Sequence, residues 1–183
     1  MPTTPNRAYR YPASTDDVRV YEDLQFLATD VDTDMAAVAV ANSVVDAVRI
    51  TTAGAMVITA TDPTEITTLR SASIGLVSGV LYRFTGQILY TAVTDAWTLE
   101  IRKTSTAGTI VGGIRLWPQS AGVPASWSFV YPCAATETVQ FFYMINRLSG
   151  TGTFTAFGVQ DGFNNTFAMI DRVGPSSILR DVA

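Results

Sequence analysis

The sequence predicts a mainly β protein in which an extended N-terminal arm and a single α-helix precede a jelly-roll β-sandwich. Three observations lead to this class. Proline punctuates residues 1–20, apolar residues follow a helical spacing over residues 21–49, and from about residue 50 they alternate with a period of two. The chain has 183 residues, which is enough for one ordinary domain with a sizeable core.

Residues 1–20 form the predicted arm. Pro2, Pro5 and Pro12 oppose a helix in this stretch. The arm is rich in arginine and tyrosine, with Arg7, Tyr9, Arg10 and Tyr11. One interpretation is a flexible leader, and the other is an arm that docks on another subunit or a partner through these four side chains. We favour the docking arm.

Residues 21–49 form the predicted helix. Its apolar residues recur at spacings of three and four, as in a heptad repeat: Leu24, Leu27, Val31, Val38, Ala41, Val45 and Val48. Asp34 interrupts this seam. An amphipathic helix packed on its own domain would show the same pattern, and so would a coiled coil between subunits. We favour the coiled coil, because few other helices are available to bury a valine-rich seam.

From about residue 50 the sequence is typical of β-strands rich in threonine and aromatic residues. Short alternating segments predict strands at 55–60, 64–70, 80–90, 97–102, 110–117, 127–131, 139–145, 154–159 and 166–172. Turn signals separate several of them, at 106–108, 119–122, 149–152 and 161–162. This number and spacing of strands predict a sandwich or jelly roll over residues 50–183.

The segment 139–146 is apolar on both faces. Phe142 and Met144 alternate with Phe141, Tyr143 and Ile145. A sandwich strand of a monomer normally shows one face to water, so a second apolar face indicates a second burial. Either an extra layer within the domain or a subunit interface would provide it, and we favour the interface.

Composition excludes much enzymology. The chain has no histidine and a single cysteine, Cys133, which removes His-based catalytic triads, His-rich metal sites and internal disulfides. Asp30, Asp32 and Asp34 lack the glycine and glutamate of a calcium loop. We therefore expect no catalytic residue, no cofactor and no metal site, and a protein that is not an enzyme.

The expected partners follow from charge and hydropathy. A net charge of −4 disfavours nucleic acid. No stretch reaches about 20 apolar residues and residues 1–15 lack a signal peptide, so we expect synthesis in a cytoplasm and no membrane insertion. The tryptophans could stack on a sugar, although core or interface positions are the commoner use: Trp97, Trp117 and Trp127.

The N-terminal region resembles virion structural proteins of tailed bacteriophages, particularly those of actinobacteria. Those openings share an N-R-x-Y-R-Y-P core and an L-A-x-D-V-D-like helix. The matching residues are Asn6, Arg7, Tyr9, Arg10, Tyr11, Pro12, Leu27, Ala28, Asp30, Val31 and Asp32. The closing segment 167–176 looks like the terminal strand of jelly-roll domains in the same proteins.

This resemblance implies a non-enzymatic structural protein, in most cases a minor tail protein. The β region is similar in layout to trimeric tumour-necrosis-factor-like jelly rolls, whose buried threefold axis would suit Phe142 and Met144. Together with the heptad seam and the second apolar face of residues 139–146, this resemblance leads us to expect a homotrimer joined by Leu24, Leu27, Val31, Val38, Val45, Phe142 and Met144.

We expect this homotrimer to be a decoration protein on the external surface of a capsid, in contact with the major capsid protein. The alternative is a minor tail protein or short tail fibre, in contact with tail proteins and able to bind host glycan.

Overall fold

A computed structural model describes residues 24–32, 43–51, 55–92, 94–160 and 164–176. The chain divides into two units, Met1–Asn42 and Ser43–Ala183. Within the first unit, residues 24–32 form an α-helix. The docking-arm residues Arg7, Tyr9, Arg10 and Tyr11 and the seam residue Val38 lie outside the described residues.

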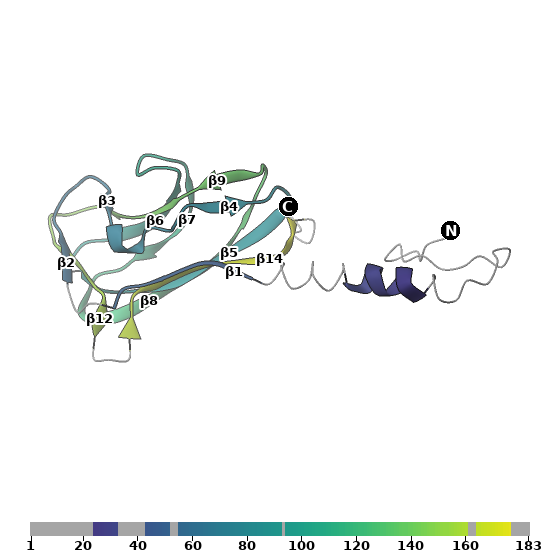
Figure 1. Ribbon diagram of the computed structural model, residues 1–183. Coiled ribbons are helices and arrows are strands. Elements are labelled where there is room, and N and C mark those ends of the chain that lie inside the picture. Colours follow the sequence, from purple (N-terminus) through teal and green to yellow (C-terminus); the bar gives the residue numbers. More distant parts are fainter. Residues whose placement is uncertain (1–23, 33–42, 52–54, 93, 161–163, 177–183) are drawn as a thin grey trace, which may run out of the picture. The chain divides into compact units, whose positions relative to one another are not determined.

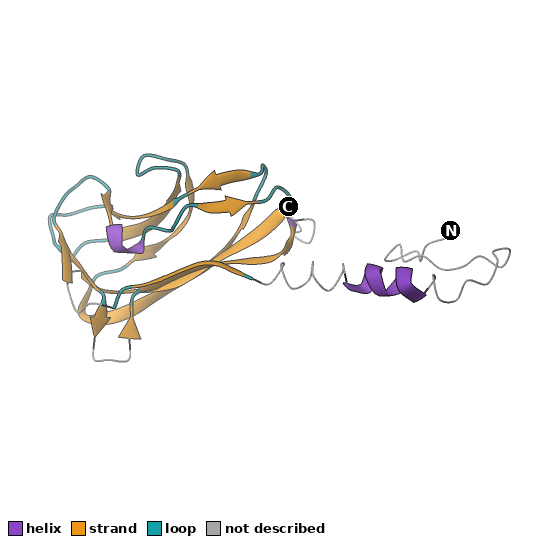
Figure 2. Ribbon diagram, viewed as in Figure 1, coloured by secondary structure: helices purple, strands orange, loops and turns teal. Residues whose placement is uncertain are grey.

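The second unit is built from two antiparallel sheets (Figures 1 and 2). The first sheet contains β1 (Val44–Arg49), β14 (Phe167–Pro175), β5 (Val80–Ala92), β8 (Gln119–Pro132), β11 (Phe154–Phe157) and β2 (Ala55–Ile58). The second contains β3 (Thr64–Glu65), β10 (Phe141–Arg147), β6 (Trp97–Lys103) and β7 (Ile110–Leu116). In the first sheet β1, β14, β5 and β8 are neighbours in that order, while β11 also pairs with β5 and β2 with β11; in the second sheet the order is β3-β10-β6-β7. These orders define a jelly-roll β-sandwich, so the predicted fold class is confirmed.

Short elements complete the β unit. They are the strand pair β4 (Ile74–Leu76) with β9 (Glu137–Val139), the pair β12 (Val159–Gln160) with β13 (Asn164–Asn165), and the 3-10 turn η1 (Thr67–Leu69). The 3-10 turn interrupts the strand that the sequence predicts over 64–70. The chain nevertheless stays along the edge of β10, because the amides of Ile66 and Ser71 donate to the carbonyls of Tyr143 and Phe141.

Strand β5 runs through the centre of the first sheet. On one side it pairs with β14 and then β11, and on the other side it pairs with β8 along most of its length. Its predicted alternation is confirmed, because Tyr82, Phe84, Ile88 and Tyr90 are all buried in the core. Aromatic rings join the two sheets there, with the Phe84 ring 4.8 Å from that of Phe141 on β10.

The structure corrects the C-terminal part of the predicted helix. Residues 44–49 form β1, so Val45 and Val48 belong to a strand and not to a helical seam. The β-branched side chains of this stretch suit a pleated sheet. Val45 and Val48 pack against the core cluster, while β1 pairs with β14. Tertiary pairing thus outweighs the local 3-4 spacing.

A second correction concerns residues 119–122, which the sequence predicts to be a turn. They form the first part of β8, because that strand continues along β5 until Gln119 pairs with Ala92. The register shift between Tyr90 and Ala92 accommodates this part of the strand. The sequence also gives no signal for β4, a three-residue strand.

Candidate interaction surfaces

The helix of residues 24–32 presents an apolar face to solvent. Leu24 is 60% exposed, Leu27 is 40% exposed and Val31 is 37% exposed. Spacings of three and four residues place these three side chains on one side of a helix. An apolar face of this kind, which no described part of the chain covers, favours association.

Phe142 and Met144 lie on the outer face of β10, and they are already buried within a single chain. Phe142 is 8% exposed and Met144 is 2% exposed. The guanidinium of Arg70 lies 4.9 Å from the centre of the Phe142 ring and pairs with Glu65 at 2.7 Å. Met144 lies in register between Glu65 and Glu100. Cover within the domain therefore accounts for the burial, and a trimer contact at these two residues stays a prediction.

Glu100 is the centre of a polar network on this outer face. Its carboxylate accepts hydrogen bonds from Arg102 Nη2 at 2.6 Å, from Asn146 Nδ2 at 3.1 Å and from Thr98 Oγ1 at 3.4 Å. Burial acts to raise the pKa of Glu100, but these hydrogen bonds and the charge of Arg102 together hold that pKa below its ordinary value. The Glu100 carboxylate is thus satisfied by polar groups of the same face.

The Glu100 network makes stability depend on pH. A lowered carboxyl pKa contributes stability above the unfolded-state value of 4.5, and this contribution is lost as the pH falls through the lower folded-state value. We expect Glu100→Gln to lower the urea midpoint at pH 7, and we expect this difference from the wild type to shrink as the pH is lowered through the folded-state pKa of Glu100. The control is Asp62→Asn, at an exposed position, with no such effect. A difference in urea midpoint between Glu100→Gln and the wild type that does not change as the pH is lowered would contradict this contribution of Glu100 to stability.

The three tryptophans occupy different environments. Trp97 and Trp127 are buried in the core, which confirms the core interpretation for these two, whereas Trp117 is 60% exposed. The guanidinium of Arg115 lies 4.5 Å from the centre of the Trp117 ring, and the Tyr90 hydroxyl donates to the Trp117 carbonyl at 3.0 Å. The sequence indicates this difference, because Trp117 directly follows Leu116, the last residue of β7. Adjacent residues of an extended chain point to opposite sides, and Leu116 is buried.

Asp95 and Arg147 form a buried ion pair beside the loop that joins β10 to β11. Their side chains are 5% and 7% exposed, and Arg147 Nε lies 3.7 Å from Asp95 Oδ2. Arg147 Nη2 donates to the carbonyls of Thr59 and Gly152 at 2.6 Å, and the Gly152 amide donates to Asp95. The pair therefore ties three loops together. No local motif in the sequence indicated it.

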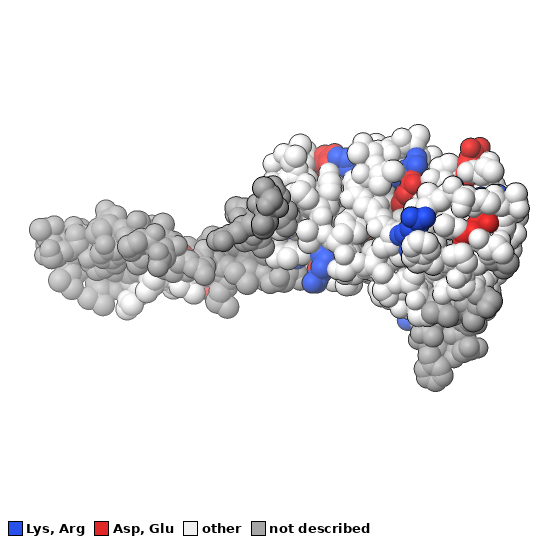
Figure 3. Space-filling view, turned by 180° about the vertical axis from the view of Figure 1, so that it is seen from behind, with Lys and Arg blue, Asp and Glu red and all other residues white. Residues whose placement is uncertain are grey.

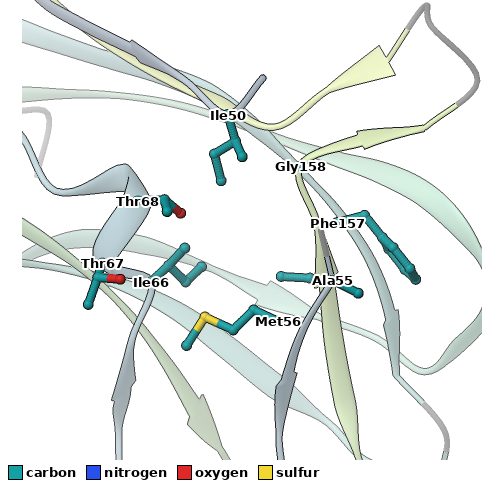
Figure 4. Close-up of a pocket in the computed structure, with 9 residues that line it drawn as sticks. Ile50, Ala55, Met56, Ile66, Thr67, Thr68, Phe157 and Gly158 are labelled. Carbon is teal, nitrogen blue, oxygen red and sulfur yellow. The ribbon is translucent and has the colours of Figure 1, made fainter. Parts of the chain in front are cut away.

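A cavity of about 350 Å³ opens between the end of β1, strand β2 and η1 (Figure 4). Its walls include Ile50, Met56, Ile66 and Phe157, with Thr67 and Thr68 supplying hydroxyl groups. Among the described residues of the lining, none carries a charged side chain.

Other chemistry is sparse in the described part of the chain. No three acidic or cysteine side chains gather there as metal ligands, and no helix there could cross a membrane. The Cys133 thiol is buried and lies 3.0 Å from the Ala135 carbonyl. On the face in Figure 3, cationic and anionic side chains lie close together and form no broad basic surface of the kind that nucleic acid requires.

No protein-family model and no curated protein sequence matches the chain. Among solved structures it is similar to the TNF protein Eiger of S. frugiperda, with 12% identity, 75% of this chain and 95% of that chain covered, and a TM-score of 0.41. It is similar to a chain of infectious bursal disease virus Gt strain, with 10% identity, 69% of this chain and 35% of that chain covered, and a TM-score of 0.36. It is also similar to a chain of infectious bursal disease virus Gx strain, with 13% identity, 67% of this chain and 36% of that chain covered, and a TM-score of 0.28. The jelly-roll assignment rests on the strand order of this chain.

Proposed function

We propose that this chain is a non-enzymatic structural protein of a virion, and that it assembles as a homotrimer displayed on the capsid as a decoration protein. The observation that carries the proposal is the exposed apolar face of the helix, formed by Leu24, Leu27 and Val31. Association of copies would bury this face, as in the seam of a coiled coil. The number of copies comes from the resemblance to trimeric jelly-roll heads.

The placement in a virion is supported by the N-terminal sequence. The same helix carries the L-A-x-D-V-D-like part of the motif shared with phage virion proteins, over residues 27–32. Joining three chains would multiply weak contacts with the particle through avidity. The residues proposed to make those contacts are Arg7, Tyr9, Arg10 and Tyr11.

The homotrimer is tested by light scattering of the purified full chain. We expect a mass of about three times the 19.7 kDa of one chain. Replacing both Leu27 and Val31 by Asp should give monomers, because charges would then face the seam. Thr29→Asp is the matched control, because Thr29 lies on the opposite side of the helix. A trimer that persists in the double variant would contradict association through this helix.

The location is tested with gold-labelled antibodies on intact particles. Label distributed over the head supports capsid decoration. Label confined to the tail would support the alternative of a minor tail protein or short tail fibre, and particles without label would contradict both placements.

A further inference from the structure

Trp117 lies at the end of the sandwich opposite to Ser43, where the described part of the β unit begins. Near Ser43, Val44 pairs with Asp171, and Asp171 pairs with Arg83 near the start of β5. Strand β5 ends at Ala92, where Gln119 pairs with it, two residues after Trp117. The end of the β unit with Trp117 is therefore remote from Ser43 along β5.

Four side chains on the outer face of the second sheet lead to this end. Asn146 on β10 is in register with Thr98 on β6, and Thr98 is in register with Arg115 on β7. Trp117 directly follows β7, and the Arg115 guanidinium lies over its ring. We call Asn146, Thr98, Arg115 and Trp117 the distal row. Their neighbours along each strand point into the core, and adjacent strands place the row over about 10 Å.

The distal row combines three kinds of recognition chemistry. The indole of Trp117 offers an exposed apolar ring. The hydroxyl of Thr98 and the amide of Asn146 are oriented by their hydrogen bonds to Glu100. Arg115 forms no ion pair with any described carboxylate, which leaves its guanidinium edge available to a ligand anion.

We propose that the distal row binds an acidic oligosaccharide. The apolar face of a pyranose ring stacks on the side of the exposed Trp117 indole away from Arg115, and a sugar carboxylate pairs with the fork of Arg115. The Thr98 hydroxyl and the Asn146 amide donate to Glu100, so they offer their oxygen atoms, Oγ1 and Oδ1, as acceptors for sugar hydroxyls. Three of the four residues lie on paired strands, and the Trp117 backbone is held by Tyr90, so little ordering is required on binding.

The experiment screens the full chain on a panel of acidic and neutral oligosaccharides, followed by titration of the best ligand. We expect an acidic oligosaccharide to bind and its methyl ester to bind about tenfold more weakly, because esterification removes the charge that faces Arg115. Trp117→Ala and Arg115→Ala should each lose about tenfold in affinity. The controls are Leu148→Ala and Arg49→Ala, both at exposed positions, with unchanged affinity.

Fluorescence assigns the ligand to the row directly. Trp97 and Trp127 are buried, so a change in emission on binding that disappears in Trp117→Phe reports stacking at Trp117. The proposal is overturned if no oligosaccharide on the panel binds, if the variants bind as well as the wild type, or if neutral and acidic forms bind equally. Binding is measured per chain, so a failure of the homotrimer and a failure of this site are distinguishable.

Discussion

Replacing Asp95 with Ala will lower the free energy of unfolding by about 3–5 kcal/mol. The substitution leaves the Arg147 guanidinium buried without its carboxylate, and it removes the acceptor of the Gly152 amide. An uncompensated buried charge of this kind is among the most costly single changes in a protein. The effect is measured by urea unfolding at pH 7.

Two further variants separate the ion pair from general damage. Asp62→Ala, at an exposed position, should change stability by less than about 0.5 kcal/mol. The double variant Asp95→Ala with Arg147→Met should be less destabilised than the sum of the single variants, because removing both charges leaves none unpaired. Additive losses would show that the two side chains are not coupled as the structure places them.

Gly86→Ala will be destabilising by about 3 kcal/mol or more, because overpacking here involves backbone as well as side chain. A Cβ at Gly86 would lie 2.2 Å from Trp127 Cζ2 and 2.5 Å from the Phe167 carbonyl oxygen. Phe167 belongs to β14 and Trp127 to β8, the two strands that flank β5 at this point. The clash is relieved only by moving a neighbouring strand.

The matched control is Gly75→Ala on β4, where an added Cβ meets nothing within 4 Å. It should change the free energy of unfolding by less than about 0.5 kcal/mol. Thermal unfolding of both variants compares the two sites. Equal melting temperatures for Gly86→Ala and the wild type would mean that Trp127 does not pack across β5 at Gly86.

Much of the candidate surface was readable from the sequence. The spacing of Leu24, Leu27 and Val31 predicted an apolar helix face, and the structure shows that face exposed. The extension of the same seam to Val45 was wrong, because a spacing of three or four over a few valines does not distinguish a helix from a strand that finds a partner. That partner is β14, which lies over 100 residues later in the chain.

The tryptophans also show which features the sequence predicts and which depend on tertiary structure. Composition alone treats Trp97, Trp117 and Trp127 as equivalent, and alternation with buried neighbours is needed to place Trp117 outside. The distal row could not be predicted from such a local pattern. The register between β10, β6 and β7 brings Asn146, Thr98 and Arg115 together, and these segments are distant in sequence. The hydrophobic pattern restricts the register between such strands, but it does not by itself say which strands become neighbours.

The sequence by itself determined the fold class and the alternation that buries Tyr82, Phe84 and Ile88, because a strand period of two is a local property of the chain. Tertiary structure decided what is not local. It recruited residues 44–49 into a sheet, covered Phe142 with Arg70 and placed Asp95 against Arg147. Each of these depends on strands pairing and packing across the sandwich, and the free energy of such contacts exceeds the local preferences that a sequence displays.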